Sequence, residues 1–365
     1  MIGISILTLN LEAAGGTLTY AREFLRALAR VGGLDYRVFV PATAPDAGEG
    51  LPSTVVHEFP ASRTRAGRVA GLSLVALAPG RVRRALRPAD LDAIHFPLGV
   101  MLPRLDAPPA AATVHDLRHE VTPELFSRGQ LVYRRRVYGW TVRRSRLVIA
   151  ISEHVRESLV QHYGLDPGRV RVIHHGVHHD VFAPGSGPRQ PFLLYPANRW
   201  PHKNHERLFE AFALVRRDRP DLRLVLTGGG HEQKPLPPGI AALGHVSIDE
   251  LVELYRTAAA LVYPTLYEGF GMPALEAMAC GCPVAVSRVA SLPEICGEAA
   301  VYFDPTSVED IARGIDSVLT DPPAGGIERA ARFTWDECAR RHDDVYRELA
   351  ATPEPPGVAA RLGRG

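Results

Sequence analysis

The chain has 365 residues, of which 46% are hydrophobic and 22% charged, so it can bury a large core and its length indicates about two domains. The formal net charge of +2 gives no general reason to expect nucleic acid as a partner. No apolar run approaches the length of a membrane-spanning helix.

The start of the chain and its cysteines favour a reduced, cytoplasmic protein. The apolar residues 1–9 have neither a basic segment nor a small-residue cleavage site, so they predict a first strand and not a signal peptide. All 4 cysteines lie in the last third and lack C-x-x-C spacing. Of 42 basic residues only Lys203 and Lys234 are lysines, so either lysine is a candidate for a specific role.

Short apolar runs alternate with helical patterns along the first half of the chain. Strands are predicted at residues 2–9, 36–40, 53–59, 93–97, 111–116, 147–152 and 171–177. Helices are predicted at residues 17–32 and 129–145.

A stretch rich in Pro, Gly and Ser predicts a linker at residues 184–190, after which the alternation restarts. Strands are predicted near residues 192–199, 222–230, 260–265, 283–287 and 300–304, with helices at 205–218, 247–258 and 273–280. Apolar strands separated by helices indicate parallel sheets. The fold class is therefore α/β, with two doubly wound Rossmann-like domains, at 1–183 and 191–334, facing a central cleft.

Two loops of the second half are candidate phosphate sites, because each follows a strand and precedes a helix. In NRWPHKN, Arg199 supplies a planar fork and Lys203 a point charge, which together suit a diphosphate, although a solvated basic loop is the alternative. In LYEGFGMPALEAMACG, the free amides at the start of a helix form an anion site.

The second loop also matches the dinucleotide fingerprint G-x-G-x-x-A through Gly269, Gly271 and Ala274. An NADP-dependent oxidoreductase could use this fingerprint, with Arg288 for the extra phosphate. That alternative leaves Glu268 and Glu276 unexplained, because carboxylates repel a diphosphate unless they accept hydrogen bonds from sugar hydroxyls.

The stretch EGFGMPALE, with its two glutamates eight residues apart, resembles the E-x7-E motif of retaining GT-B glycosyltransferases, specifically glycosyltransferase family 4. Other stretches are similar in order and spacing, among them GGTLTYAREFLRAL, TVHDL, VIAISEHVRESL, NRWPHKN, LTGGG and FTWDECARRHDDVYREL. The resemblance implies an N-terminal acceptor-side domain and a C-terminal nucleotide-sugar domain. It also implies a final helix, at residues 335–350, that crosses back to the first domain, followed by a disordered tail at 351–365.

The resemblance assigns roles to matching residues. Arg199 and Lys203 would bind the donor diphosphate, Glu276 the ribose hydroxyls, and Glu268 the transferred sugar. His115 would contact that sugar, with Asp116 orienting its loop. Backbone contacts to the donor are implied at Gly15, Gly16, Gly228, Val246, Phe270, Gly271 and Met272.

Two patterns suggest a metal, and for both we favour another interpretation. HHGVHHD offers His174, His175, His178 and His179, but adjacent histidines on a strand point to opposite faces. His178 also stands where the family often has aspartate. The D-x-D at residues 90–92 immediately precedes a predicted strand and suits a helix-to-strand junction. We therefore expect no metal and no cofactor, with the nucleotide sugar as a substrate.

The resemblance implies hexose transfer with retention of configuration, through same-face attack in which the leaving phosphate takes the acceptor proton. GDP-mannose ranks first as donor and UDP-hexoses second, by analogy. The acceptor could be a glycan, a lipid-linked sugar or a small natural product. A catalytically silent GT-B binding protein is a further alternative, against which the intact Arg199, Lys203, Glu268 and Glu276 set argues.

Arginine-rich segments at residues 63–87 and 134–146 suggest a peripheral contact with an anionic membrane at its inner face. The interpretation we favour is a wall of the acceptor cleft with solvated arginines.

Overall fold

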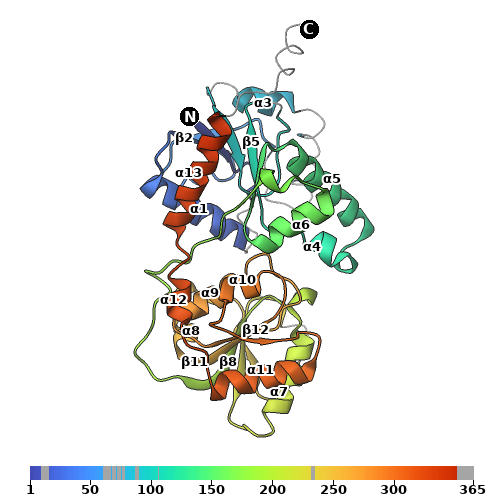
Figure 1. Cartoon of the computed structure of the whole chain (residues 1–365), viewed down its shortest axis with the longest axis vertical. Helices are drawn as coiled ribbons and strands as arrows, with labels where there is room; N and C mark the ends of the chain where they lie inside the picture. Colours follow the sequence, from blue (N-terminus) through green and yellow to red (C-terminus); the bar gives the residue numbers. More distant parts are fainter. Residues whose placement is uncertain are drawn as a thin grey trace. The chain divides into compact units, whose positions relative to one another are not determined.

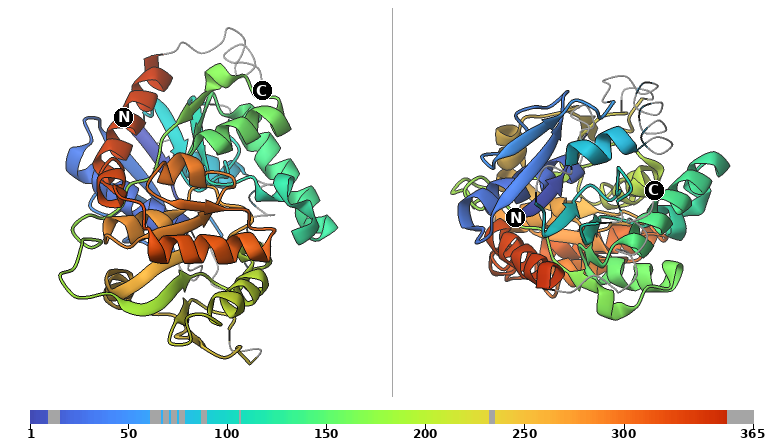
Figure 2. Two further views of the ribbon diagram at one scale, coloured as in Figure 1. Left: turned by 60° about the horizontal axis from the view of Figure 1, so that its bottom comes forward. Right: turned by 90° about the horizontal axis from the view of Figure 1, so that it is seen from above.

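The computed structural model describes residues 1–9, 16–60, 67, 71, 75, 79–86, 90–105, 107–231 and 235–351. Its contacts divide the chain into two units: the first joins Met1–His175 to the chain from Trp335 onwards, and the second is Gly176–Thr334. Figures 1 and 2 show a central sheet with helices on both faces in each unit. Within the described ranges, no helix is long and apolar enough to cross a membrane.

The sheet of the first unit has seven strands in the order β3-β2-β1-β4-β5-β6-β7, all paired in parallel. The strands are β1 Ile2–Ser5, β2 Tyr36–Pro41, β3 Ser53–Val56, β4 Ala93–Phe96, β5 Ala110–Val114, β6 Leu147–Ala150 and β7 Val170–Val172. Every residue of β1, β4, β5 and β6 is buried, which is why these strands are mostly apolar and do not alternate; Ser5, His95 and Thr113 are their buried polar residues.

The helices of the first unit cover this sheet. They are α1 Gly16–Val31, α3 Gly80–Leu86, α4 Arg118–Val121, α5 Arg128–Arg144, α6 Glu153–Tyr163 and α13 Trp335–Ala351. α1 buries Tyr20, Phe24 and Leu28, which recur every four residues and so lie on one face. α13 packs against α1, far from it in sequence.

A buried polar network ties α13 to the sheet of the first unit. The ring of His95 lies 2.7 Å from the Tyr346 hydroxyl and 2.8 Å from Thr113 Oγ1. The Tyr20 hydroxyl lies 3.1 Å from His342 Nε2. Burial lowers the pKa of His342 to about 4, so this imidazole is neutral near pH 7.

The sheet of the second unit has six parallel strands in the order β10-β9-β8-β11-β12-β13. The strands are β8 Gln190–Pro196, β9 Arg223–Thr227, β10 Ile240–Ala242, β11 Ala258–Tyr263, β12 Val284–Ser287 and β13 Val301–Phe303. The helices are α7 His205–Val215, α8 Ile248–Thr257, α9 Met272–Ala279, α10 Leu292–Cys296, α11 Val308–Thr320 and α12 Gly326–Ala330. α7 packs on α11 and α9 on α12, on opposite sides of the sheet in Figure 1.

The fold confirms the predicted fold class of two parallel α/β Rossmann-like domains. The contact division falls at residue 175, and the stretch predicted as the linker, 184–190, belongs to the second unit up to the start of β8. The tail was predicted at residues 351–365; Ala351 is instead the last residue of the final helix, and residues 352–365 lie outside the described chain. The predicted D-x-D junction at 90–92 has no regular structure and is followed directly by β4, with Asp92 paired to the chain's N-terminal ammonium.

Several predicted strands are shorter than expected, among them β1, β3 and β7. We expected residues 171–177 to be extended, whereas β7 ends at Val172, so the four histidines follow the strand and are not on it. His175 is buried, and its ring stacks between those of Tyr20 and Trp335 at centroid distances of 4.7 and 5.7 Å. His179 Nε2 lies 3.1 Å from the Phe333 carbonyl oxygen, in the second unit. The described residues hold no group of three or more His, Cys, Asp or Glu that could bind a metal.

Candidate active site

The two candidate loops of the second unit follow neighbouring strands. After β8 the chain builds β9 and β10 on one side, and it then returns to place β11 on the other side of β8. The carboxyl ends of β8 and β11 therefore form the switch point of this sheet, where doubly wound folds bind ligands. The loop 197–204 leaves β8 and the loop 264–271 leaves β11.

Hydrogen bonds join these two loops to each other. The Leu266 amide donates to the His202 carbonyl at 2.8 Å, and Thr265 Oγ1 donates to the same oxygen at 3.1 Å. Asn204, in the left-handed conformation with φ of 60°, ends the short turn Pro201–Lys203 and donates through Nδ2 to the Pro264 and Pro305 carbonyls. These bonds hold the backbone at both strand ends in place, as preorganisation requires.

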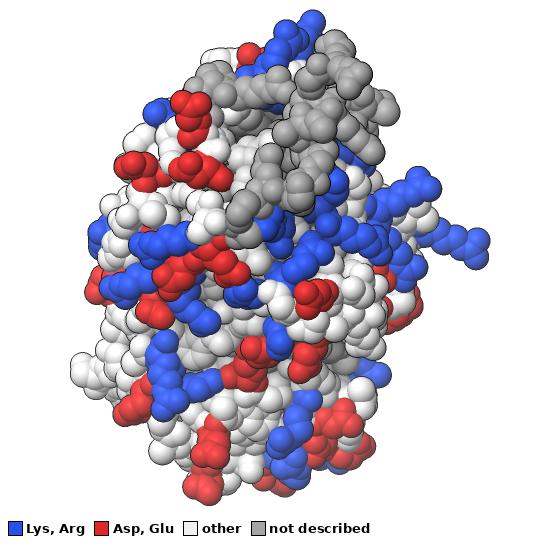
Figure 3. Space-filling model, turned by 45° about the horizontal axis from the view of Figure 1, so that its top comes forward, with Lys and Arg blue, Asp and Glu red and all other residues white. Residues whose placement is uncertain are grey.

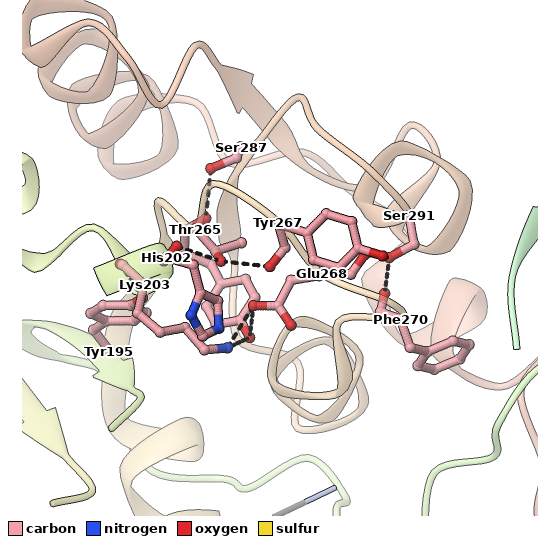
Figure 4. A network of polar contacts seen from close by, with 10 residues as sticks. Tyr195, His202, Lys203, Thr265, Tyr267, Glu268, Phe270, Ser287 and Ser291 are labelled. Carbon is pink, nitrogen blue, oxygen red and sulfur yellow. Dashed lines mark hydrogen bonds and ion pairs between the residues drawn. The ribbon is translucent and has the colours of Figure 1, made fainter. Parts of the chain in front are cut away.

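Lys203, Tyr263 and Glu268 form a closed triangle of polar contacts. Figure 4 shows the Lys203 side chain pointing toward the Glu268 carboxylate. Lys203 Nζ lies 2.5 Å from Glu268 Oε1 and donates to the Tyr263 hydroxyl at 2.9 Å. The Tyr263 hydroxyl in turn donates to Glu268 Oε1 at 2.9 Å. Lys203 and Glu268 are 12% and 15% exposed, so this ion pair is largely removed from water but can still be reached by a ligand.

Tyr263 is fully buried at the last position of β11. Burial, and then the nearby Glu268 carboxylate, raise the pKa of Tyr263 well above its usual value, so its hydroxyl keeps its proton. The backbone carbonyl of Lys203 accepts a further bond, of 2.5 Å, from the hydroxyl of Tyr195 on β8. Two strand tyrosines thus fix the lysine at both its backbone and its ammonium.

The loop after Glu268 leads into α9 through Gly271. Gly271 has φ of 106°, and a Cβ there would lie 2.6 Å from Leu292 Cδ2, so only glycine fits. Ser291 Oγ lies 3.0 Å from the Glu268 carbonyl and 2.8 Å from that of Phe270. Among the described residues no side chain caps this end of α9, which leaves the helix N-terminus to a ligand.

Glu276 lies one turn into α9, four residues after Met272 and hence on the same face. The Tyr255 hydroxyl donates to Glu276 Oε2 at 3.0 Å. Burial raises the pKa of Glu276 to about 7, partly offset by this hydrogen bond. A carboxyl with such a pKa can accept hydroxyl hydrogen bonds and gains most from them when ionised.

Arg199 makes different contacts from Lys203. Its Nη2 pairs with Glu206 Oε1 at 2.7 Å, and its guanidinium carbon lies 5.6 Å from the ring centre of Phe209. Arg199 Nη1 is buried and has no hydrogen-bond partner in the described part of the chain. The structure therefore brings Lys203 and Glu268 together and leaves Arg199 outside their triangle.

The glycines of LTGGG allow the loop after β9 to approach the loop after β8. Gly228 has φ of 96°, and a Cβ there would lie 2.9 Å from the amide nitrogen of Asn198. Asn198 Oδ1 accepts from the Gly229 amide at 2.7 Å, and a Cβ at Gly229 would lie 3.0 Å from His245 Nε2. His245 and its partly exposed neighbour Val246 thus lie beside this glycine loop.

The comparisons with known proteins cover both units. A family model described as glycosyl transferases group 1 matches residues 179–335, and one described as Glycosyltransferase Family 4 matches residues 14–181. The chain belongs to the group 1, family 4 glycosyltransferases. The dinucleotide fingerprint at 269–274 is accordingly no evidence for an oxidoreductase, and Arg288, its supposed phosphate ligand, lies over the ring of Tyr302 instead.

Three relatives of this glycosyltransferase differ in coverage. O-antigen chain mannosyltransferase B from Escherichia coli is 29% identical over 306 residues, 75% of this chain and 78% of that protein. The MMP alpha-(1->4)-mannosyltransferase from Mycolicibacterium hassiacum is 30% identical over 273 residues, 67% of this chain and 66% of that protein. A D-inositol 3-phosphate glycosyltransferase from Streptomyces bingchenggensis is 32% identical over 238 residues, and the match spans about half of that protein, 52%.

Solved structures share the fold. Sucrose-phosphate synthase from Thermosynechococcus elongatus superposes with a TM-score of 0.76 at 23% identity, covering 96% of this chain and 99% of that one. HepE from Anabaena, solved in complex with UDP-glucose, gives a TM-score of 0.67 at 17% identity, covering 95% and 99%. This glycosyltransferase therefore has the GT-B architecture of two Rossmann-like domains.

The candidate residues of the first unit lie around the end of β5. His115 Nε2 lies 2.7 Å from the Pro97 carbonyl oxygen, and burial lowers the pKa of His115. Asp116 Oδ1 accepts from the Arg118 amide at 3.1 Å, which holds the loop of the glycosyltransferase at this point. Gly16 begins α1, and among the described residues no atom lies within 4 Å of a Cβ added there; Gly15 lies outside the described residues.

Tyr263 and Ser291 are the site residues of this glycosyltransferase that sequence reasoning missed. Tyr263 is the last residue of the apolar strand β11, directly before the loop 264–271. A side chain at the carboxyl end of such a strand can reach the loop that follows, and this position could have identified Tyr263. Ser291 lies 23 residues after Glu268, and its bond to that carbonyl depends on the path of the chain after β12.

Proposed function

We propose that the protein transfers a hexose from a nucleotide-diphosphate sugar to a hydroxyl group, with retention of configuration and without a metal. The observation that carries this proposal is the Lys203–Tyr263–Glu268 triangle beside the uncapped start of α9. A cation and helix amides suit a diphosphate, and a carboxylate close to them suits the hydroxyls of the sugar attached to it.

In the proposed reaction the bond between the anomeric carbon and the diphosphate oxygen breaks, and the acceptor oxygen bonds to that carbon on the same face. The departing phosphate oxygen takes the acceptor proton. Lys203 and the amides of Gly271 and Met272 would stabilise the charge on the diphosphate. The carboxylate of Glu268 would accept hydrogen bonds from the sugar, and that of Glu276 from the ribose.

The relatives support mannose as the sugar and GDP-mannose as the first donor to test, because two of the three are mannosyltransferases. UDP-hexoses rank second, supported by the solved complex of HepE with UDP-glucose. The proposed acceptor is a glycan, a lipid-linked sugar or a small molecule. The cytoplasm, where nucleotide sugars are used, is the proposed place of the reaction.

The test uses the full chain with GDP-mannose, UDP-glucose, UDP-galactose and dTDP-glucose, in the presence of EDTA, and NMR of the product's anomeric proton. We expect one donor to be turned over with retention. Lys203→Ala and Glu268→Ala should lower kcat by about 100-fold or more, since single stabilising groups contribute that much. The exposed Glu253→Gln on α8 is the matched control. Wild-type turnover in either alanine variant, or an inverted product, would refute the proposal.

A peripheral membrane contact is proposed for the segment of α4 and α5. Residues 118–146 carry eight arginines against two glutamates, although the whole chain is nearly neutral. Arg128, Val132 and Arg136 recur every four residues on one face of α5, and Figure 3 shows basic side chains projecting where α5 lies. Four large hydrophobic side chains in this region are 38–54% exposed: Val121, Leu125, Val132 and Tyr133. Most of the other arginine-rich segment, 63–87, lies outside the described residues.

Flotation with liposomes of phosphatidylcholine, with and without 30% phosphatidylglycerol, tests this contact. We expect binding only to the anionic vesicles, and loss of binding at high salt because the attraction is electrostatic. Arg128→Gln/Arg136→Gln should weaken flotation, whereas the exposed pair Arg217→Gln/Arg223→Gln of the second unit should not. Equal flotation of both double variants would refute the assignment to α5.

A further inference from the structure

A cavity of about 690 Å³ lies beside the first turns of α7, within the second unit. Its lining comes from the loop before α7, from α7 itself, and from Gly230, Leu266 and Val308. Neither Lys203 nor Glu268 belongs to this lining, so the cavity is separate from the triangle described above. Small-molecule sites have volumes of about 300–1,000 Å³, which is the size class of this cavity.

The cavity is close to the proposed reaction centre along the chain. Leu266 stands two residues before Glu268, and its amide is bonded to the His202 carbonyl next to Lys203. Trp200 lies on the same loop as Lys203, on the other side of the turn Pro201–Lys203. One short backbone segment therefore carries cavity residues and triangle residues together.

Within the described lining of the cavity, the charged groups balance one another. The lining holds two guanidiniums, of Arg199 and Arg207, and two carboxylates, of Glu206 and Glu210. Arg199 pairs with Glu206 at 2.7 Å, yet Glu206 remains 70% exposed and keeps accepting capacity. A phosphate or carboxylate ligand would meet two carboxylates as well as two guanidiniums, so this lining offers an anion no net attraction. Guanidiniums donate hydrogen bonds and carboxylates accept them, and a hydroxyl group can do both. Equal numbers of the two groups therefore suit a neutral ligand rich in hydroxyl groups.

Trp200 supplies the apolar surface of the cavity. Its side chain is 48% exposed, which is unusual for so large an aromatic group in a folded domain, and its ring stacks on that of His202 with centroids 5.7 Å apart. The electron-rich face of an indole attracts the slightly positive C–H groups of a pyranose ring. An exposed indole beside hydrogen-bonding carboxylates and guanidiniums is the chemistry that recognises a sugar.

We propose that this cavity, the Trp200 cavity, is a carbohydrate subsite that binds one or two neutral sugar units of the acceptor glycan. The proposal rests on the proposed glycosyltransfer. Acceptors that carry sugar units able to occupy the cavity would then be preferred over simple alcohols.

Tryptophan fluorescence tests the subsite, because the chain has only 3 tryptophans and they differ in environment. Trp335 is 5% exposed and Trp140 is covered by the Arg104 guanidinium, 4.6 Å from its ring centre, which leaves Trp200 as the exposed reporter. The full chain, without donor, is titrated with α-mannobioses and with maltose. We expect a saturable emission change for at least one disaccharide, retained in Trp140→Phe.

Glu210→Gln keeps the reporter and should weaken disaccharide binding about tenfold, the effect of losing a hydrogen bond to a charged group. Glu253→Gln, on α8 and outside the cavity, is the matched control. Absence of any saturable change, or equal affinities in both variants, overturns the subsite. A response to mannose 6-phosphate alone also overturns it, because the cavity would then select an anion.

Nucleotide binding, measured by thermal shift with GDP and UDP, separates this proposal from the proposed function. Both glutamine variants should bind the nucleotide as the wild type does. Failure of sugar binding with nucleotide binding intact overturns the Trp200 cavity alone. Sugar binding without any nucleotide binding or donor turnover overturns the proposed function, and with it the assignment of the bound sugar as an acceptor.

Discussion

Replacement of Tyr263 by phenylalanine removes the hydroxyl that joins Lys203 to Glu268 and leaves the ring in place. That hydroxyl makes two bonds of 2.9 Å to charged atoms, and bonds of this kind contribute about 1.5–3 kcal/mol each. Lys203 and Glu268 still pair directly at 2.5 Å, and each retains some contact with water. We therefore expect the free energy of unfolding to fall by about 2 kcal/mol, which lowers Tm by about 4–8 °C.

The same substitution should slow transfer. If about half of that free energy holds the Lys203 ammonium where the diphosphate charge develops, kcat falls about fivefold. KM for the donor should change less, because the Lys203–Glu268 pair and the start of α9 remain. Steady-state kinetics give kcat and KM, with whichever donor the wild type turns over in the test above. Calorimetric melts of the ligand-free protein give Tm.

Tyr302→Phe is the control for this prediction. Tyr302 is also in the second unit, and its hydroxyl donates to the Gly297 carbonyl at 2.5 Å, away from the triangle. It should lower Tm and leave kcat unchanged. Wild-type kcat in Tyr263→Phe, or an equal loss of kcat in both variants, would refute the positioning role of Tyr263.

Gly271→Ala places a Cβ 2.6 Å from Leu292 Cδ2 at a φ of 106°. We therefore expect the free energy of unfolding, measured in calorimetric melts, to fall by about 1–3 kcal/mol and GDP binding to weaken. An unchanged melt would mean that the loop adapts without cost. The pKa of Glu276 is about 7 in the folded protein against 4.5 for the free side chain, so the folded state binds more protons in this window and the ligand-free protein loses stability as pH rises from 4.5 through 7. Glu276→Gln should remove that slope from Tm measured against pH and weaken nucleotide binding at pH 8; a slope that persists in the variant would exclude Glu276 as its source. Burial lowers the pKa of His342 from 6.5 to about 4, so the folded state binds fewer protons here than the unfolded chain. The part of the free energy of unfolding that depends on a neutral His342, up to about 3 kcal/mol, is complete above pH 6.5 and is lost as pH falls toward 4. In His342→Gln the acid side of the stability profile should be flatter, and an identical acid limb would contradict this account.

The order of strands and helices could be predicted closely from the sequence, because buried parallel strands are mostly apolar and are separated by helices of a different period. β2 and β6 are examples, found within two residues at each end. The extents of β1, β3 and β7 were overestimated. Polar residues follow β3 and β7, at His57 and His174, and the prediction ran past them. After β1 the buried apolar residues Ile6 and Leu7 continue past the last paired residue. Burial favours apolar residues in both places, so composition does not mark where pairing stops.

The chemistry of the site could also be anticipated in part. Lys203, Glu268 and Glu276 could be selected from residue type, spacing and position after strands. The assignment of Arg199 and Lys203 to one diphosphate rests on the family resemblance and on their shared loop, and it stays a prediction. In the structure their side chains pair with different residues, Glu206 and Glu268. In a short loop, four residues of separation do not determine the direction of a side chain.

Local patterns in the chain therefore account for the elements, the glycine at the start of α9 and the acids beside it. The contacts that make a site of them join residues far apart in sequence: Lys203 meets Tyr263 and Glu268 after intervals of 60 and 65 residues. In the first unit, His342 of α13 contacts Tyr20, which lies 322 residues earlier in the chain. Such contacts follow from the order of strands in each sheet, which brings the ends of β8 and β11 together, and no local pattern of residues contains that order.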